Sequence, residues 1–79
     1  MHIASRNGNA SVIKLLLSKK ANIEAKHSEL ATPLHIASQN GHSTSVEILI
    51  SYHANIEAID KDLLTPLFLA SRNGHATIA

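Results

Sequence analysis

Apolar side chains recur with helical spacing directly after a Thr-Pro pair in the middle of the chain. Leu34, Ala37 and Ser38 fall on one face of a helix of about two turns. Thr32 suits the N-cap of this helix. Pro33 suits its first position, because the fixed φ of proline fits there and its missing N–H is not needed. The pattern therefore predicts a short helix that begins after Thr32.

A second helix is predicted over roughly 43–51. Thr44 and Glu47 have the spacing of a capping box near its start. Its buried stripe is predicted at positions i, i+3 and i+4, namely Val46, Leu49 and Ile50. Ser45 interrupts the apolar face of this helix and weakens it.

Asn-Gly pairs occur three times in the chain, at 7–8, 40–41 and 73–74. Asn-Gly is also the strongest short signal for a β-hairpin turn. Here, however, the apolar residues on both sides have helical rather than alternating spacing. We therefore predict the tight turn of a helical hairpin, in which the glycine takes a positive φ.

An alternating segment, Ala-Asn-Ile-Glu-Ala, follows the second helix at 54–58 and is repeated at 21–25. Alternation of small or apolar residues with polar ones is typical of an extended strand with one buried face. We therefore predict an extended arm that buries Ile56 and the two alanines. The arm leads through 59–64 to the next Thr-Pro pair.

The whole pattern repeats every 33 residues. Residues 1–26 match 34–59 at 13 of 26 positions, and residues 27–46 match 60–79 at 10 of 20. A fixed period of this length is typical of stacked repeat proteins, in which each unit buries its apolar face on the next. We therefore expect a single repeat domain over 1–79, consisting of a partial repeat (1–26), a full repeat (27–59) and a partial repeat (60–79).

Charge and composition narrow the range of partners. Seven basic and six acidic side chains are scattered along the chain, so no basic stripe points to nucleic acid or to an anionic membrane. One Tyr, one Phe and no Trp make no platform for stacking bases. No apolar run approaches a membrane span, and the N-terminus lacks the pattern of a signal peptide. We expect an intracellular protein, cytoplasmic or nuclear, that binds neither nucleic acid nor membrane.

Catalytic and metal-binding patterns are also absent from the sequence. There is no cysteine, which excludes disulfides, thiolate metal sites and thiol nucleophiles. A helix break separates His35 from His42, and His27 and His53 fall in predicted loops. The serine that follows the core alanine, Ser38 in the full repeat, recurs in every repeat, which is typical of a scaffold residue. We expect no catalytic residue, no cofactor and no metal.

These residues resemble the ankyrin repeat family. The resemblance rests on Thr-Pro-Leu-His at 32–35, Asn-Gly-His at 40–42, the Leu/Ile-rich second helix and the segment 54–58, all on the 33-residue period. It implies an all-α solenoid of stacked helix-turn-helix repeats with β-hairpin-like finger loops. It also implies a non-catalytic protein–protein interaction module, in which His2 and His35 hydrogen-bond to the backbone of the neighbouring finger.

Four positions depart from the family pattern, which has glycine two residues before Thr-Pro and again before the extended arm. Leu30 and Leu63 stand at the first position, and Lys20 and His53 at the second. If the backbone keeps a positive φ there, each of these residues costs roughly 1 kcal/mol. The alternative is that these loops adopt other turn types.

In this family, the partner surface consists of the finger tips and the exposed end of the first helix. Carried over residue by residue, the resemblance implies the candidates Arg6, Asn7, Lys19, Ser28, Glu29, Ala31, Gln39, Asn40, Tyr52, Lys61, Asp62, Leu64, Arg72 and Asn73. Tyr52 is the strongest hot-spot candidate, as the only aromatic residue expected on that surface. Leu63 and Leu64 form an apolar pair that either binds a partner or packs against Leu30.

The two ends of the predicted stack suggest an alternative function. Neither end carries the polar outer face that a terminal repeat needs. Apolar side chains are expected at both, namely Met1, Ile3 and Leu16 at one end and Leu67, Leu69 and Ile78 at the other. Such ends can stack head to tail, so the alternative is a homo-oligomer that assembles through its uncapped ends.

Overall fold

Five helices make up the described part of the chain. The computed structural model describes residues 1–26, 30–72 and 74. The helices are α1 (His2–Arg6), α2 (Ala10–Ser18), α3 (Pro33–Gln39), α4 (Ser43–Ser51) and α5 (Pro66–Arg72). No strand occurs among these residues, which confirms the prediction of an all-α repeat fold.

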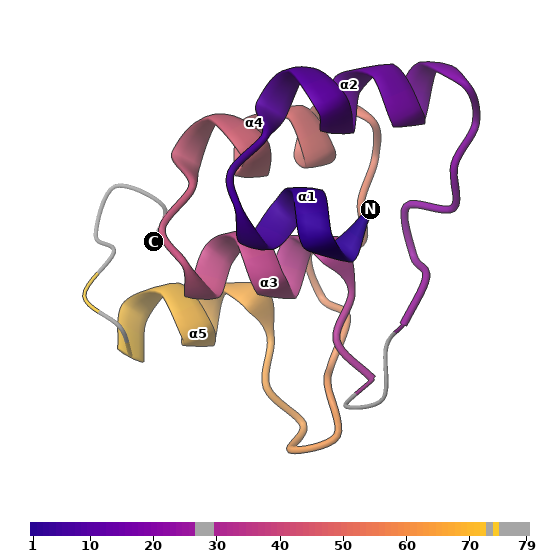
Figure 1. The fold of residues 1–79 in the computed structure, drawn as a ribbon. Coiled ribbons are helices and arrows are strands. Elements are labelled where there is room, and N and C mark those ends of the chain that lie inside the picture. Colours follow the sequence, from indigo (N-terminus) through magenta and orange to yellow (C-terminus); the bar gives the residue numbers. More distant parts are fainter. Residues whose placement is uncertain (27–29, 73, 75–79) are drawn as a thin grey trace.

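The helices form two layers (Figure 1). The first helices of the repeats, α1, α3 and α5, lie side by side in one layer, and α2 and α4 form the other. Within each pair, the second helix runs back antiparallel to the first. The segment that leads into α5 projects from the helical body as a long loop, and we call its residues 59–64 the second finger.

The start of α3 is as predicted. Thr32 is its N-cap, and the hydroxyl oxygen of Thr32 accepts a hydrogen bond from the backbone N–H of His35 at 3.4 Å. The ring atom Nδ1 of His35 accepts in return from the Thr32 N–H at 3.1 Å, which completes a capping box. Pro33 occupies the first helical position, and Pro33 to Ser38 are all buried. The helix is therefore capped locally and covered on all sides.

The start of α4 differs from the prediction. The helix begins at Ser43, its N-cap is His42, and no side chain caps it by a hydrogen bond. Thr44 therefore lies inside the first turn instead of before it, so the predicted capping box with Glu47 is wrong. The capping-box spacing was present, but the preceding turn sets the start of the helix.

That turn has the geometry predicted for a helical hairpin. Gly41 has φ 73°, and the N–H groups of Gly41 and His42 donate to the carbonyls of Ser38 and Ala37. This pair of bonds is a Schellman motif, which requires a left-handed residue just after the helix. Gly8 has φ 70° in the same turn of the first repeat, so the Asn-Gly pairs end helices and form no β-hairpin.

The four positions that lack the family glycine keep its backbone conformation. Lys20 and His53 have φ 67° and 70°, and Leu30 and Leu63 have φ 61° and 64°. At His53, the Schellman bonds that end α4 impose this conformation, because His53 N–H donates to Ile50 and Ala54 N–H to Leu49. The alternative of relaxed turns is therefore wrong, and each side chain is held in a strained region.

The predicted extended arm is a turn. The side-chain oxygen of Asn55 accepts from the Glu57 N–H at 2.9 Å, and the Ala58 N–H donates to the Asn55 carbonyl at 3.3 Å. Asparagine favours such turns because its side chain can bond to the backbone two residues on. Ala54 and Ala58 are buried as predicted, but Ile56 is exposed.

The core lies between the two helical layers. Ile13 and Leu17 of α2, Leu34 and Ala37 of α3 and Leu49 of α4 form its centre. These positions follow the predicted helical stripes, so the local pattern and the packing agree.

Ser45, like Ser5, is a buried serine whose hydroxyl is unpaired among the described residues. It is 1% exposed, and its Oγ atom has no hydrogen-bond partner among the described residues. A buried hydroxyl without a partner costs about 1–3 kcal/mol. Ser45 therefore weakens the apolar face of α4, as expected, because its hydroxyl is buried without a partner among the described residues.

Candidate functional site

Histidine side chains join each repeat to the next. His2 Nε2 lies 3.1 Å from the Ala31 carbonyl oxygen, and His35 Nε2 lies 2.8 Å from the Leu64 carbonyl oxygen. A carbonyl can only accept, so Nε2–H is the donor in both contacts. This confirms the role expected for His2 and His35. These histidines hold the loops in place and are not free to bind a ligand.

Asp60 closes the second finger. Its carboxylate accepts from the N–H groups of Asp62 at 2.9 Å and Leu64 at 3.0 Å. Burial acts to raise the pKa of Asp60, but these two hydrogen bonds outweigh it, together with the nearby positive charge of Arg72. The net result is a pKa below the usual value, so the ionised carboxylate holds the loop.

His42 fixes the end of α1, where the candidate Arg6 stands. Its Nε2 atom lies 2.8 Å from the Arg6 carbonyl oxygen and donates to it. The imidazole also packs on Gly8, where a Cβ would come within 2.7 Å of Nδ1. Only glycine fits that contact. His42 of the second repeat therefore holds the end of α1 and the turn that follows it in position.

A polar hollow of about 320 Å³ lies between α1 and α3, at the ends of the first helices. Its lining residues are His2, Ile3, Arg6, Ile36, Gln39 and Asn40. Three of the predicted candidates, Arg6, Gln39 and Asn40, are thus brought together from two repeats. They combine a guanidinium with two carboxamides beside apolar isoleucine side chains.

Other candidates are placed elsewhere. Lys19 and Tyr52 are the C-caps of α2 and α4. Because each second helix runs antiparallel to the first, these C-caps lie at the end of the helical body where α1 and α3 begin, away from Arg6, Gln39 and Asn40. Lys61 and Asp62 are exposed on the second finger. The candidate surface therefore comprises at least three separate regions rather than one.

Several candidates are not confirmed as surface residues. The side chain of Ala31 is buried, and its carbonyl is used by His2, so Ala31 offers no side chain to a partner. Leu64 is half-buried, and its carbonyl is used by His35. Asn7, by contrast, is exposed, and it is the C-cap of α1. Ser28, Glu29 and Asn73 lie outside the described residues.

Phe68 of α5 is an exposed aromatic residue that the candidates did not include. Phe68 is 49% exposed, and the guanidinium of Arg72 lies 5.9 Å from the centre of its ring, a cation–π distance. Two aromatic side chains, Tyr52 and Phe68, are therefore exposed among the described residues. The signal was in the sequence, since Phe68 replaces the histidine of the repeat and cannot make its hydrogen bond.

Apolar side chains are exposed at the second finger and just before Ala31. Leu63 is 72% exposed and Leu30 is 49% exposed. Both residues have a positive φ and stand where the family pattern has glycine. Leu30 and Leu63 are therefore two further exposed apolar side chains that the candidates did not include.

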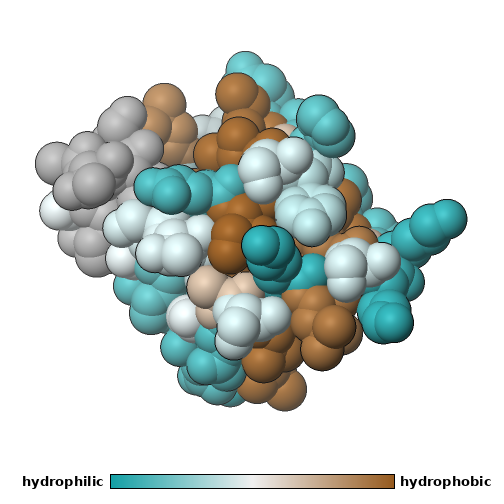
Figure 2. All heavy atoms as spheres, turned by 90° about the horizontal axis from the view of Figure 1, so that it is seen from above, coloured by the Kyte–Doolittle hydropathy of each residue, from teal (hydrophilic) through white to brown (hydrophobic). Residues whose placement is uncertain are grey.

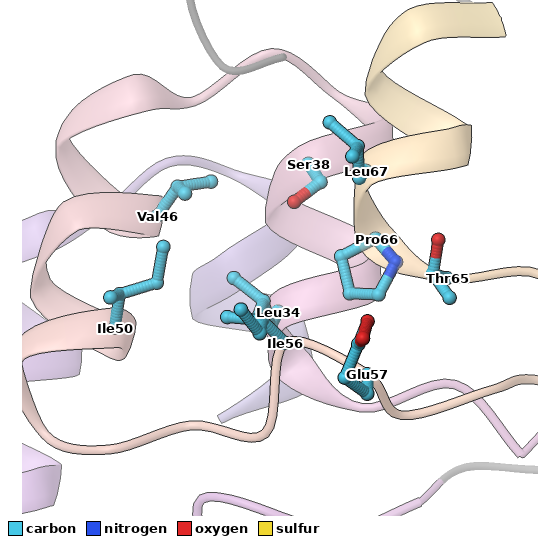
Figure 3. Close-up of a pocket in the computed structure, with 9 residues that line it drawn as sticks. All are labelled: Leu34, Ser38, Val46, Ile50, Ile56, Glu57, Thr65, Pro66 and Leu67. Atoms are coloured by element: carbon cyan, nitrogen blue, oxygen red, sulfur yellow. The ribbon is translucent and has the colours of Figure 1, made fainter.

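An apolar groove of about 220 Å³ opens between α4 and α5 (Figure 3). Val46 and Ile50 line it from α4, Leu67 from α5 and Ile56 from the arm, while Leu34 lies at the back. Ile50 is 46% exposed, although Leu17, its counterpart 33 residues earlier, is 7% exposed. The difference arises because α4 covers Leu17, and no described helix covers Ile50. The predictions that Ile50 and Ile56 are buried are therefore wrong.

Apolar side chains are exposed at both ends of the described stack. Ile3, Val12 and Leu15 are exposed at the first repeat, and Leu67 and Phe68 at the last. Seen from the side of α2 and α4, apolar surface lies between polar side chains (Figure 2). Of the residues expected at these ends, Leu69 is buried, Met1 and Leu16 are half-buried, and Ile78 lies outside the described residues.

Metal sites and membrane-spanning helices are both absent from residues 1–26, 30–72 and 74. No group of three histidine or acidic side chains stands close enough to hold a metal ion in that part of the chain. No helix there is long and apolar enough to cross a membrane.

Comparison with known proteins agrees with the architecture. The family model for ankyrin repeats (3 copies) matches residues 1–79, which is the whole sequence. No curated protein matches the chain. The match covers the same repeats that α1–α2, α3–α4 and α5 form in the structure. The chain therefore belongs to the ankyrin repeat family.

Proposed function

We propose that this chain is a non-catalytic protein-binding module and that it binds its partner at the ends of the first helices. Ankyrin repeats generally mediate protein–protein interactions. The hollow supports this location of the binding site, because it brings together Arg6 of the first repeat with Gln39 and Asn40 of the second. Arginine is enriched at the binding hot spots of protein interfaces, and polar groups beside an apolar floor suit an interface.

The packing around the hollow supports this location. The histidine contacts to Ala31 and Arg6 hold α1 and α3 in a defined relation, so the hollow is formed before a partner arrives. A preformed site loses little conformational entropy on binding. The exposed Phe68–Arg72 pair extends the same row of first helices to the third repeat.

The test compares the proteins retained by the immobilised chain and by two variants. Arg6→Ala with Gln39→Ala removes the polar wall of the hollow, and Lys14→Ala with Glu47→Ala alters exposed residues of α2 and α4. We expect the control variant to retain the partners of the unchanged chain and the hollow variant to lose them, with equal melting temperatures. Equal retention by both variants would place the binding site elsewhere, with Tyr52 and the second finger next to be tested.

Self-association is a second proposal, and the apolar groove favours it. Ile50, Ile56 and Leu67 leave apolar surface open at the end of the stack. A second copy that covered this surface would remove it from water, which stabilises by about 25 cal/mol per Å² of apolar area. The mass from light scattering should then rise with concentration, and Ile50→Asp should abolish the rise. A constant mass near 8.5 kDa would refute this proposal.

A further inference from the structure

The first helices carry charge of only one sign. Among the described residues, α1, α3 and α5 contain Arg6 and Arg72 but no aspartate or glutamate. The described acidic side chains lie on the arms, on α4 and on the second finger, namely Glu24, Glu47, Glu57, Asp60 and Asp62. The surface formed by the first helices is therefore cationic although the chain as a whole is nearly neutral.

The two arginines on this surface are not equivalent. Arg72 packs over the ring of Phe68, and its charge acts on Asp60, so it already has partners within the chain. Arg6 is exposed, and no described residue pairs with its guanidinium. The equivalent position in the second repeat is occupied by the neutral Gln39. The uncompensated positive charge of this surface is therefore concentrated at Arg6, in the hollow.

We propose that the hollow between α1 and α3 binds an extended acidic segment of a partner protein, with one aspartate or glutamate carboxylate on Arg6. The proposal rests on the protein-binding function proposed above. A guanidinium presents paired N–H donors that match a carboxylate, and this pairing is among the strongest polar contacts in proteins. The Asn40 carboxamide can both donate and accept, so it can bond to the backbone of the same segment.

The apolar part of the hollow adds a second requirement. Ile3 is 68% exposed and lines the hollow beside Arg6. An apolar side chain next to the acidic residue of the partner would cover Ile3 and exclude water from the ion pair, which strengthens it. The preferred segment therefore has an acidic residue with an apolar neighbour, and a run of acidic residues is not needed.

The test selects short random peptides displayed on phage against the immobilised chain. Selected peptides are synthesised, and their affinity is measured by fluorescence anisotropy for the unchanged chain, for Arg6→Gln and for Lys14→Gln. Lys14→Gln removes an equal charge from the exposed side of α2 and is the matched control. We expect the selected peptides to share an acidic residue and an apolar neighbour.

A double-substitution cycle gives the decisive readout. Replacing the acidic residue of the peptide by its amide should weaken binding about five- to tenfold for the unchanged chain and for Lys14→Gln, and hardly at all for Arg6→Gln. Peptides that lack an acidic residue, yet lose affinity when Ile3 or Asn40 is replaced by Ala, would overturn this inference and leave the binding function standing. Peptides insensitive to every change in the hollow would overturn both.

Discussion

The imidazole of His35 donates to the Leu64 carbonyl across 2.8 Å, and this bond joins the second repeat to the second finger. The same ring accepts from the Thr32 N–H, so one side chain both caps α3 and holds the next loop. His35 is fully buried, and its loss would leave the Thr32 N–H without a partner. It would also break the direct bond to the Leu64 carbonyl, which would keep only the Asp60 N–H as a donor.

Replacing His35 by Leu should therefore lower the free energy of unfolding by about 2–4 kcal/mol, because it removes both bonds inside the protein. Urea denaturation followed by circular dichroism measures the change. The matched control is Phe68→Leu, at the same position one repeat later, where the side chain is half-exposed and makes no such bonds. Similar losses for both variants would show that the histidine bonds do not stabilise the stack.

Glycine at the strained helix ends should stabilise the protein. Lys20→Gly and His53→Gly each remove a side chain from a left-handed residue and should raise the free energy of unfolding by about 0.5–1 kcal/mol, after the entropy lost by glycine is subtracted. Lys19→Gly is the control, because its φ of −93° suits any residue, and it should destabilise the protein. A gain at Lys19 equal to that at Lys20 would rule out backbone strain as the cause.

Ser45→Ala should also stabilise the protein. The change removes a buried hydroxyl that has no partner among the described residues and leaves no large cavity, so we expect a gain of about 1 kcal/mol. Ser11→Ala, on the exposed side of α2, should change the melting temperature little. If Ser45→Ala lowered the melting temperature, the hydroxyl would have to bond to a group not described, such as a buried water.

The lowered pKa of Asp60 predicts that the folded protein loses stability in acid. This pKa is lower in the folded chain than in the unfolded one, so the stabilisation is fully present above the unfolded value of about 4 and is lost as the pH falls through the folded value. Asp60→Asn should remove that part of the pH dependence, which denaturation at a series of pH values measures. The exposed Asp62→Asn is the control. An unchanged pH profile in Asp60→Asn would show that other groups dominate.

The helices could be predicted from the sequence because their signals are local. Thr32, Pro33 and the 33-residue period place α3, and the Asn-Gly turn separates it from α4. The resemblance marked the four positions that lack the glycine of the family, but only the structure showed that their backbone keeps a positive φ. The capping box at Thr44 failed because two local signals competed, and the Schellman turn at Gly41 set the boundary.

The candidate site was less predictable. The sequence placed Arg6, Gln39 and Asn40 at the ends of first helices, but only packing showed that they line one hollow while Tyr52 lies at the other end of the helices. Exposure of Phe68 likewise depends on what lies over α5. Equal repeat positions predict equal local conformation, and they do not predict equal surroundings.

By itself, the sequence determined the repeat and the helical hairpins, because spacing and capping act within a few residues. Only the tertiary structure decided which members of each repeated stripe are covered. Leu17 is buried and Ile50 is not, although both stand at the same position, because the cover of one repeat is supplied by the next. Whether a side chain in a stack is buried depends on the neighbouring repeat. The hollow and the groove depend on neighbouring repeats in the same way.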